Sequence, residues 1–239
     1  KEVIAKLFRN KIYSLIKKEN ARQAIYSMVF KVFGLFFNYS IFVYLAKKYT
    51  PSSVGEFSLL LTCIAVFGII GVVGLDIFSL KKISSGKLST DLYFNLIFNA
   101  ILSSVIITII FLTIIWFFFH QKINEMIRLE NKWFFFSIII LLSNILSIIN
   151  ESIRAFRKAG FYSFLKNNSF ILFCLIILLI LNKLNVEIDL IKALAFGYFI
   201  STSISCVFLY KILKNNKLVI NTNFNFRNLF KLLNESYQF

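Results

Sequence analysis

Six long apolar runs, each of about 20 residues or more and nearly free of charge, recur along this sequence. A bilayer hydrocarbon core of about 30 Å is crossed by roughly 20 helical residues at 1.5 Å rise per residue. The chain is 58% hydrophobic with a mean hydropathy of +0.76, whereas a soluble domain is about 45–50% apolar. A transmembrane β-barrel would need alternating segments of about 10 residues, and these runs are continuous. The sequence therefore predicts an all-α, polytopic membrane protein.

The apolar runs predict six transmembrane helices within a single lobe, residues 23–215. The expected spans are 25–46, 57–80, 93–119, 133–153, 161–181 and 191–213. Before them, residues 1–22 form a basic amphipathic segment, which we expect to lie in the membrane interface or to serve as a solvated lead-in helix. After them, residues 216–239 are expected to form a cytoplasmic connector and the start of a seventh span. We therefore expect this chain to be the N-terminal part of a longer protein.

Lysine and arginine are distributed unevenly between the two sides of this predicted bundle. With the N-terminus in the cytoplasm, 20 of the 27 lysines and arginines fall on the cytoplasmic side and 7 on the other. Cytoplasmic loops carry such an excess, and the excess sets the orientation of the bundle. The bias predicts a cytoplasmic N-terminus. It also accounts for much of the +16 net charge without a nucleic-acid partner.

A predicted helical hairpin at 30–85 contains most of the residues that interrupt the apolar runs of the sequence. Its two apolar runs are joined by a polar turn that holds the single proline, Pro51. Gly68, Gly71 and Gly74 lie three residues apart on its second run, and small residues let helices approach closely. The glycines predict either static helix packing or a face that slides during a conformational cycle.

Three polar side chains inside the first two spans are candidate site residues. Asp76 is costly in an apolar run, so it is expected either to pair with Lys81, Lys82 or Lys31, or to face a lumen and bind a proton or Na⁺. Lys31 can snorkel to the cytoplasmic surface or point into a cavity and contact an anionic substrate. Asn38 lies seven residues further on roughly the same helix face, which would extend a polar stripe along the first span.

A basic collar follows the fourth span. Glu151 and Arg154 are three residues apart and can pair on one helix face. Arg154, Arg157, Lys158 and Lys166 then form a cluster of positive charge. The cluster is either the ordinary cytoplasmic charge signal or a docking site for a phosphate headgroup, because a guanidinium can bind phosphate through two parallel hydrogen bonds.

Residue types that would carry catalysis or bind metal are scarce. His120 is the only histidine, and we interpret it as an interfacial residue. The three cysteines, Cys63, Cys174 and Cys206, lie inside apolar runs without metal-ligand spacing, as small buried hydrophobic residues do. The sequence therefore predicts no metal site, no cofactor and no enzymatic activity.

Several segments resemble a known family. They are AKKYTP at 46–51, VGEFS at 54–58, GVVGLD at 71–76, NESIRAFRKAG at 150–160 and FKLLNES at 230–236. Together they resemble bacterial polysaccharide-biosynthesis membrane proteins, the O-antigen and capsule flippases of the MATE-like exporter superfamily. Thr50 stands where that family usually has glycine.

The resemblance implies that the chain is one six-helix lobe of a two-lobed transporter in the bacterial inner membrane. Such a protein would move an undecaprenyl-pyrophosphate-linked oligosaccharide from the cytoplasmic to the periplasmic leaflet by alternating access. Its other expected partners are membrane lipids and polysaccharide-assembly proteins. On burial and charge, Lys31 and Arg154 are the candidate anion contacts, Asn38 a further substrate contact and Asp76 the candidate ion-coupling acid. The alternatives are a cation-coupled multidrug exporter of the same fold and a non-transporting membrane assembly subunit.

Overall fold

The computed structural model describes residues 19–49, 51–86, 92–127, 132–167, 169–184, 186 and 189–216. Throughout these ranges the ordered elements are helices and none is a strand. In chain order they are α2 (Glu19–Lys48), α3 (Pro51–Val72), α4 (Leu75–Ser84), α5 (Leu92–Ile127), α6 (Trp133–Ala155), α7 (Ala159–Asn167), α8 (Ser169–Lys183) and α9 (Leu190–Asn215). Most of the predicted amphipathic segment at 1–22 and nearly all of the predicted connector at 216–239 lie outside the described residues.

Five of these helices are long and apolar enough to cross a bilayer, namely α2, α3, α5, α6 and α9. Helices α7 and α8 meet at an angle of 48° and form a sixth span if the bent pair is counted as one. The prediction of an all-α, multi-pass membrane protein is therefore confirmed. The predicted fifth span at 161–181 is a broken element instead of a single straight helix.

The second predicted span, 57–80, is also broken. Helix α3 begins earlier, at Pro51, which suits the first helical position because its backbone lacks an N–H that would be unsatisfied there. The helix ends at Val72, and the next two residues, Val73 (φ 47°) and Gly74 (φ 75°), adopt the left-handed conformation. Helix α4 then starts at Leu75, so the prediction of one continuous helix is wrong at this point.

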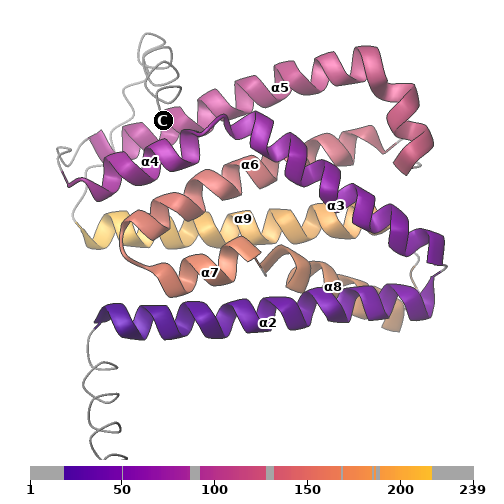
Figure 1. The fold of residues 1–239 in the computed structure, drawn as a ribbon, viewed down its shortest axis with the longest axis horizontal. Coiled ribbons are helices and arrows are strands. Elements are labelled where there is room, and N and C mark those ends of the chain that lie inside the picture. The colour runs from indigo at the N-terminus through magenta and orange to yellow at the C-terminus, as the bar shows by residue number, and fades with distance from the viewer. Residues whose placement is uncertain are drawn as a thin grey trace, which may run out of the picture.

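The helices run roughly side by side, with α6 and α9 in the middle of the bundle, α2 at one edge and α5 at the opposite edge (Figure 1). Helix α6 packs against α3, α4, α5, α7 and α9. The main cluster of buried apolar side chains joins α2, α3, α5, α6, α8 and α9, with Ile41, Phe57 and Ile139 almost fully enclosed. Helix α6 is thus the central helix of the bundle, and the candidate site is built around it.

Two glycines of α3 lie at close contacts with neighbouring helices. A Cβ at Gly71 would collide with the side chains of Thr108 on α5 and Asn144 on α6, and Gly68 also faces Asn144. Small residues of this kind drive helix association in lipid, because lipid tails are as apolar as the buried leucines and burial alone gives little driving force. Gly68 and Gly71 therefore lie at helix contacts, whereas Gly74 lies in the helix break. Sliding of this face during a conformational cycle stays a prediction.

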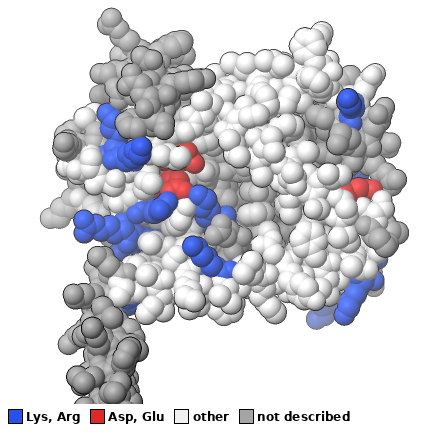
Figure 2. Space-filling view, in the orientation of Figure 1, with Lys and Arg blue, Asp and Glu red and all other residues white. Residues whose placement is uncertain are grey.

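Charge is concentrated at the two ends of the bundle, with an uncharged band between them (Figure 2). One end holds the start of α2, the corner between α6 and α7, and the last turn of α9 (Figure 1). We call it the basic end, after Arg22, Arg154, Arg157, Lys211 and Lys214. At the opposite end, Lys132 and Lys192 form ion pairs with Asp189 at 3.2 and 3.5 Å, which connects the start of α6 to the start of α9.

Candidate functional site

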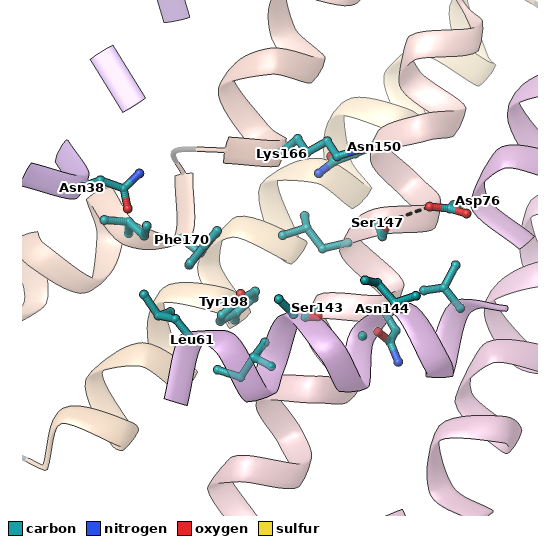
Figure 3. A pocket seen from close by; sticks show the side chains of 17 residues that line it. Asn38, Leu61, Asp76, Ser143, Asn144, Ser147, Asn150, Lys166, Phe170 and Tyr198 are labelled. Atoms are coloured by element: carbon teal, nitrogen blue, oxygen red, sulfur yellow. Dashed lines mark hydrogen bonds between the residues drawn. The ribbon is translucent and has the colours of Figure 1, made fainter. Parts of the chain in front are cut away.

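A cavity of about 480 Å³ lies among the spanning helices, between α2, α3, α6 and the broken α7–α8 pair (Figure 3). Apolar side chains of α3 and α8 form much of its wall. Its polar lining residues come from five different helices: Asn38, Asp76, Ser143, Asn144, Ser147, Asn150, Lys166 and Tyr198. Two of the four predicted site residues, Asn38 and Asp76, therefore line one cavity, and they approach it from opposite sides (Figure 3).

Asp76 reaches the cavity because the second span is broken. It lies in the first turn of α4, where the helix dipole favours a negative charge. One carboxylate oxygen accepts a hydrogen bond from the backbone N–H of Ile77 at 2.8 Å, and the other accepts one from the Ser147 hydroxyl at 3.2 Å (Figure 3). No described lysine or arginine forms an ion pair with it. The expected pairing with Lys81, Lys82 or Lys31 is therefore not what the described chain shows, and proton or Na⁺ binding stays a prediction.

Asn38 lies on α2 at the other side of the cavity. Its amide donates to the backbone carbonyl oxygen of Gly34, one turn earlier, at 3.0 Å. This local bond satisfies the side-chain nitrogen of Asn38 as a donor in an otherwise apolar stretch of helix. The rest of the group is available to a polar ligand in the cavity.

Lys166 is the cavity residue that sequence reasoning missed. It is the one lysine or arginine among the described residues that line the cavity, as Asp76 is the one acid. In the sequence it belongs to the basic collar, but the bend between α7 and α8 brings it to the cavity wall. The available signal was its position six residues after Gly160, well inside the fifth apolar run.

Glu151 holds Lys166 in place. The side chain of Glu151 is only 5% exposed, and its carboxylate accepts hydrogen bonds from Lys166 at 2.6 Å, Tyr162 at 2.7 Å and Arg154 at 3.2 Å. Three donors, two of them charged, offset the cost of burying the carboxylate. The predicted pairing of Glu151 with Arg154 is confirmed. Arg154 itself is not among the residues that line the cavity.

Lys31 lies in a second hollow, of about 410 Å³, at the basic end of the bundle. Gln23 and Ser27 from α2 and Arg157 from the α6–α7 corner share this hollow with it. The polar stripe predicted from Lys31 to Asn38 is therefore divided between two separate spaces.

Buried hydroxyl and amide groups link the helices around the cavity. Asn144 donates to Thr108 at 2.7 Å, Ser104 donates to the carbonyl oxygen of Gly71 at 3.0 Å, and Ser205 donates to Asn150 at 3.4 Å. Such bonds are the polar contacts that join transmembrane helices. Their sequence signal is weak, because single serines and asparagines in apolar runs do not show which neighbour they will meet.

The cavity can hold a polar or charged group inside the membrane-spanning part of the protein. It offers one cation, one carboxylate and several neutral donors and acceptors. Within the described ranges, no group of three or more His, Cys, Asp or Glu residues is placed to hold a metal ion. The side chain of His120 lies outside the described residues.

Comparison of the chain with protein-family models, with curated proteins and with solved structures found no match.

Proposed function

We propose that this chain is one MATE-like lobe of a flippase that moves undecaprenyl-pyrophosphate-linked O-antigen or capsule oligosaccharide units across the bacterial inner membrane. The observation that carries the proposal is the cavity of about 480 Å³ among the spanning helices, whose largely apolar wall also carries amide, hydroxyl and charged side chains. A glycan cannot cross hydrocarbon unaided, because each desolvated hydroxyl without a partner costs several kcal/mol. A cavity with amide, hydroxyl and charged groups can shelter it, and alternating access would carry it from the cytoplasmic to the periplasmic leaflet.

The charge distribution supports an anionic, lipid-linked substrate. Lys166 supplies a cation in the cavity, and Arg154 donates to the same carboxylate, that of Glu151, as Lys166 does. Lys31 adds a cation at the basic end, which would face the cytoplasm. In this proposal Lys31 and Arg154 meet the pyrophosphate as it enters, Asn38 contacts the substrate in the cavity, and Asp76 binds the coupling ion.

The test is complementation in the bacterium that encodes the chain. Deleting the gene should leave the lipid-linked glycan in the cytoplasmic leaflet, and the full-length protein should restore it to the periplasmic leaflet. Replacing Lys166 with Gln should restore much less, whereas replacing Lys122, an exposed lysine at the far end of α5, with Gln should restore fully. Glycan that still reaches the periplasmic face in the deletion strain would overturn the proposal. The outcome would then favour an assembly subunit that does not transport.

A second candidate is a cation-coupled multidrug exporter of the same fold. The placement of Asp76 in the cavity favours it, because a membrane-buried acid can carry a coupling proton or Na⁺. Efflux of cationic dyes from cells discriminates between the two. An exporter would lower dye accumulation and leave the lipid-linked glycan unchanged, whereas a flippase would do the reverse.

A further inference from the structure

The hollow that contains Lys31 is built by a close contact between α2 and α7. Gly160 allows this contact, since a Cβ there would lie 2.8 Å from Cβ of Tyr26. The backbone N–H of Gly160 donates to the side-chain oxygen of Gln23 at 3.0 Å, and the hydroxyls of Ser27 and Ser163 share a hydrogen bond. The α6–α7 corner is therefore fixed against one side of α2, and the hollow beside it has defined walls.

The backbone of the corner directs Arg157 into this hollow. Arg157 adopts the left-handed conformation with φ 60°, which is unfavourable for a residue with a side chain. Its backbone N–H donates to the carbonyl oxygen of Arg154 at 2.9 Å, so the turn closes the end of α6. Its side chain is exposed and lines the hollow together with Lys31.

Two cations without acidic partners thus share one space. The seven residues that line the hollow include Lys31 and Arg157 and no acid. Neither of the two forms an ion pair within the described part of the chain, in contrast to Arg154, Lys166, Lys132 and Lys192. The guanidinium can form two parallel hydrogen bonds to phosphate oxygens, and the ammonium adds a point charge.

The same face of α2 continues as exposed apolar surface. Met28 lines the hollow and is 71% exposed, and Leu35 further along this face is 72% exposed. In a spanning helix such side chains contact lipid chains. A ligand seated here would therefore place its anionic group between Lys31 and Arg157 and its hydrocarbon along α2.

We propose that the α2–α7 hollow is a binding site for the phosphate headgroup of an anionic phospholipid, with Lys31 and Arg157 as its charged contacts. The proposal requires the membrane-spanning fold and shares Lys31 with the proposed entry of the substrate, but lipid binding here does not require that the protein transports. Phosphate is the shared chemistry, and the adjacent apolar face of α2 selects a lipid over free phosphate. A lipid bound here would connect α2 to the α6–α7 corner.

Native mass spectrometry of the full-length protein in detergent tests the site with phosphatidylglycerol, with zwitterionic phosphatidylcholine and with inorganic phosphate. The wild type should retain phosphatidylglycerol in preference to the other two. The double variant Lys31→Gln/Arg157→Gln should bind it about 25-fold more weakly, because each cation near an anionic surface contributes roughly a fivefold factor. A control with the same charge loss at the same end of the bundle, Lys211→Gln/Lys214→Gln, should bind within about twofold of the wild type.

Three results would overturn the proposal. Equal retention of phosphatidylcholine by the wild type would remove the charge selectivity, and this measurement needs no variant to fold. Equal weakening in the Lys211→Gln/Lys214→Gln control would show that only the overall charge matters. Displacement of phosphatidylglycerol by an equal concentration of inorganic phosphate would show a free-phosphate site.

Discussion

Glu151 fixes the position of Lys166, the cation of the cavity, and that of the α6–α7 corner. Replacing it with Gln removes the charge that Lys166 and Arg154 share and leaves both cations uncompensated. Removing one partner of a buried ion pair costs about 3–5 kcal/mol, and the partly exposed lysine and arginine place this site at the lower end. We expect Glu151→Gln to lower the unfolding free energy by about 3 kcal/mol in a thermal or denaturant unfolding assay in detergent.

A second variant shows whether the loss comes from the charge. In Glu151→Gln/Lys166→Gln the uncompensated ammonium is gone, so part of the stability should return. A double variant that is less stable than Glu151→Gln by the full cost of Lys166→Gln alone would mean that the two residues do not interact.

Asp189 makes the connection at the opposite end sensitive to pH. Partial burial raises its pKa, but the hydrogen bond and charge of Lys132, with the charge of Lys192, outweigh burial and hold the pKa of Asp189 below its ordinary 3.8. A depressed carboxyl pKa stabilises the fold above the ordinary value, and this contribution is lost as the pH falls through the folded-state pKa. We expect Asp189→Asn to cost about 0.5 kcal/mol at pH 7, since the pair is solvent-screened.

The pH profile of unfolding is the measurement for Asp189. The difference in stability between the wild type and Asp189→Asn should shrink as the pH is lowered from 5 toward 3. A difference that stays constant over that range would rule out the carboxylate charge as its source.

At the scale of helices, Gly71 controls how closely α3 approaches α5 and α6. An added methyl group would collide with Asn144 and Thr108. It would push these two side chains apart and break the hydrogen bond between them. Overpacking of this kind costs about 1–3 kcal/mol, so Gly71→Ala should lower the unfolding temperature. Gly55→Ala is the matched control, because nothing lies within 4 Å of a Cβ there and alanine favours the helix. Equal effects of the two substitutions would contradict the packing role of Gly71.

The helices themselves could be predicted from the sequence, but their breaks could not. Long apolar runs specify spanning helices because no other structure satisfies the backbone in lipid. The break at Val73 and Gly74 leaves the hydrophobic pattern unchanged, since Val72, Val73 and Leu75 are all apolar. It depends on two left-handed backbone conformations, which tertiary packing selects.

The same distinction applies to the site. Asn38 and Asp76 could be identified because a polar group inside an apolar run is costly and stands out. Lys166 also stands inside a predicted span, but the cytoplasmic excess of lysine and arginine was a sufficient explanation for it. Its place in the cavity follows from the bend between α7 and α8, a property of the folded helices together.

For the whole molecule, the central question is whether water enters the cavity, because a transport pathway requires it and a packed helix bundle does not. A cysteine at Ser147 would lie on the cavity wall beside Asp76. In a variant whose three native cysteines are replaced, Ser147→Cys should react with a charged, membrane-impermeant thiol reagent, because only a hydrated thiol ionises readily. Ile110→Cys is the control, since this residue is exposed on the outer surface of α5 and would contact lipid.

Applying the reagent to one membrane face at a time also tests the orientation. In inside-out vesicles the reagent contacts the cytoplasmic face, and in spheroplasts it contacts the periplasmic face. Because Asp76 and Ser147 lie toward the basic end, a cytoplasm-facing basic end predicts faster labelling of Ser147→Cys in inside-out vesicles, while Ile110→Cys stays unlabelled in both. Labelling of Ser147→Cys no faster than that of Ile110→Cys would show a dry cavity. It would leave the helix bundle intact as a description of the fold and remove the physical basis for carrying a polar substrate through it.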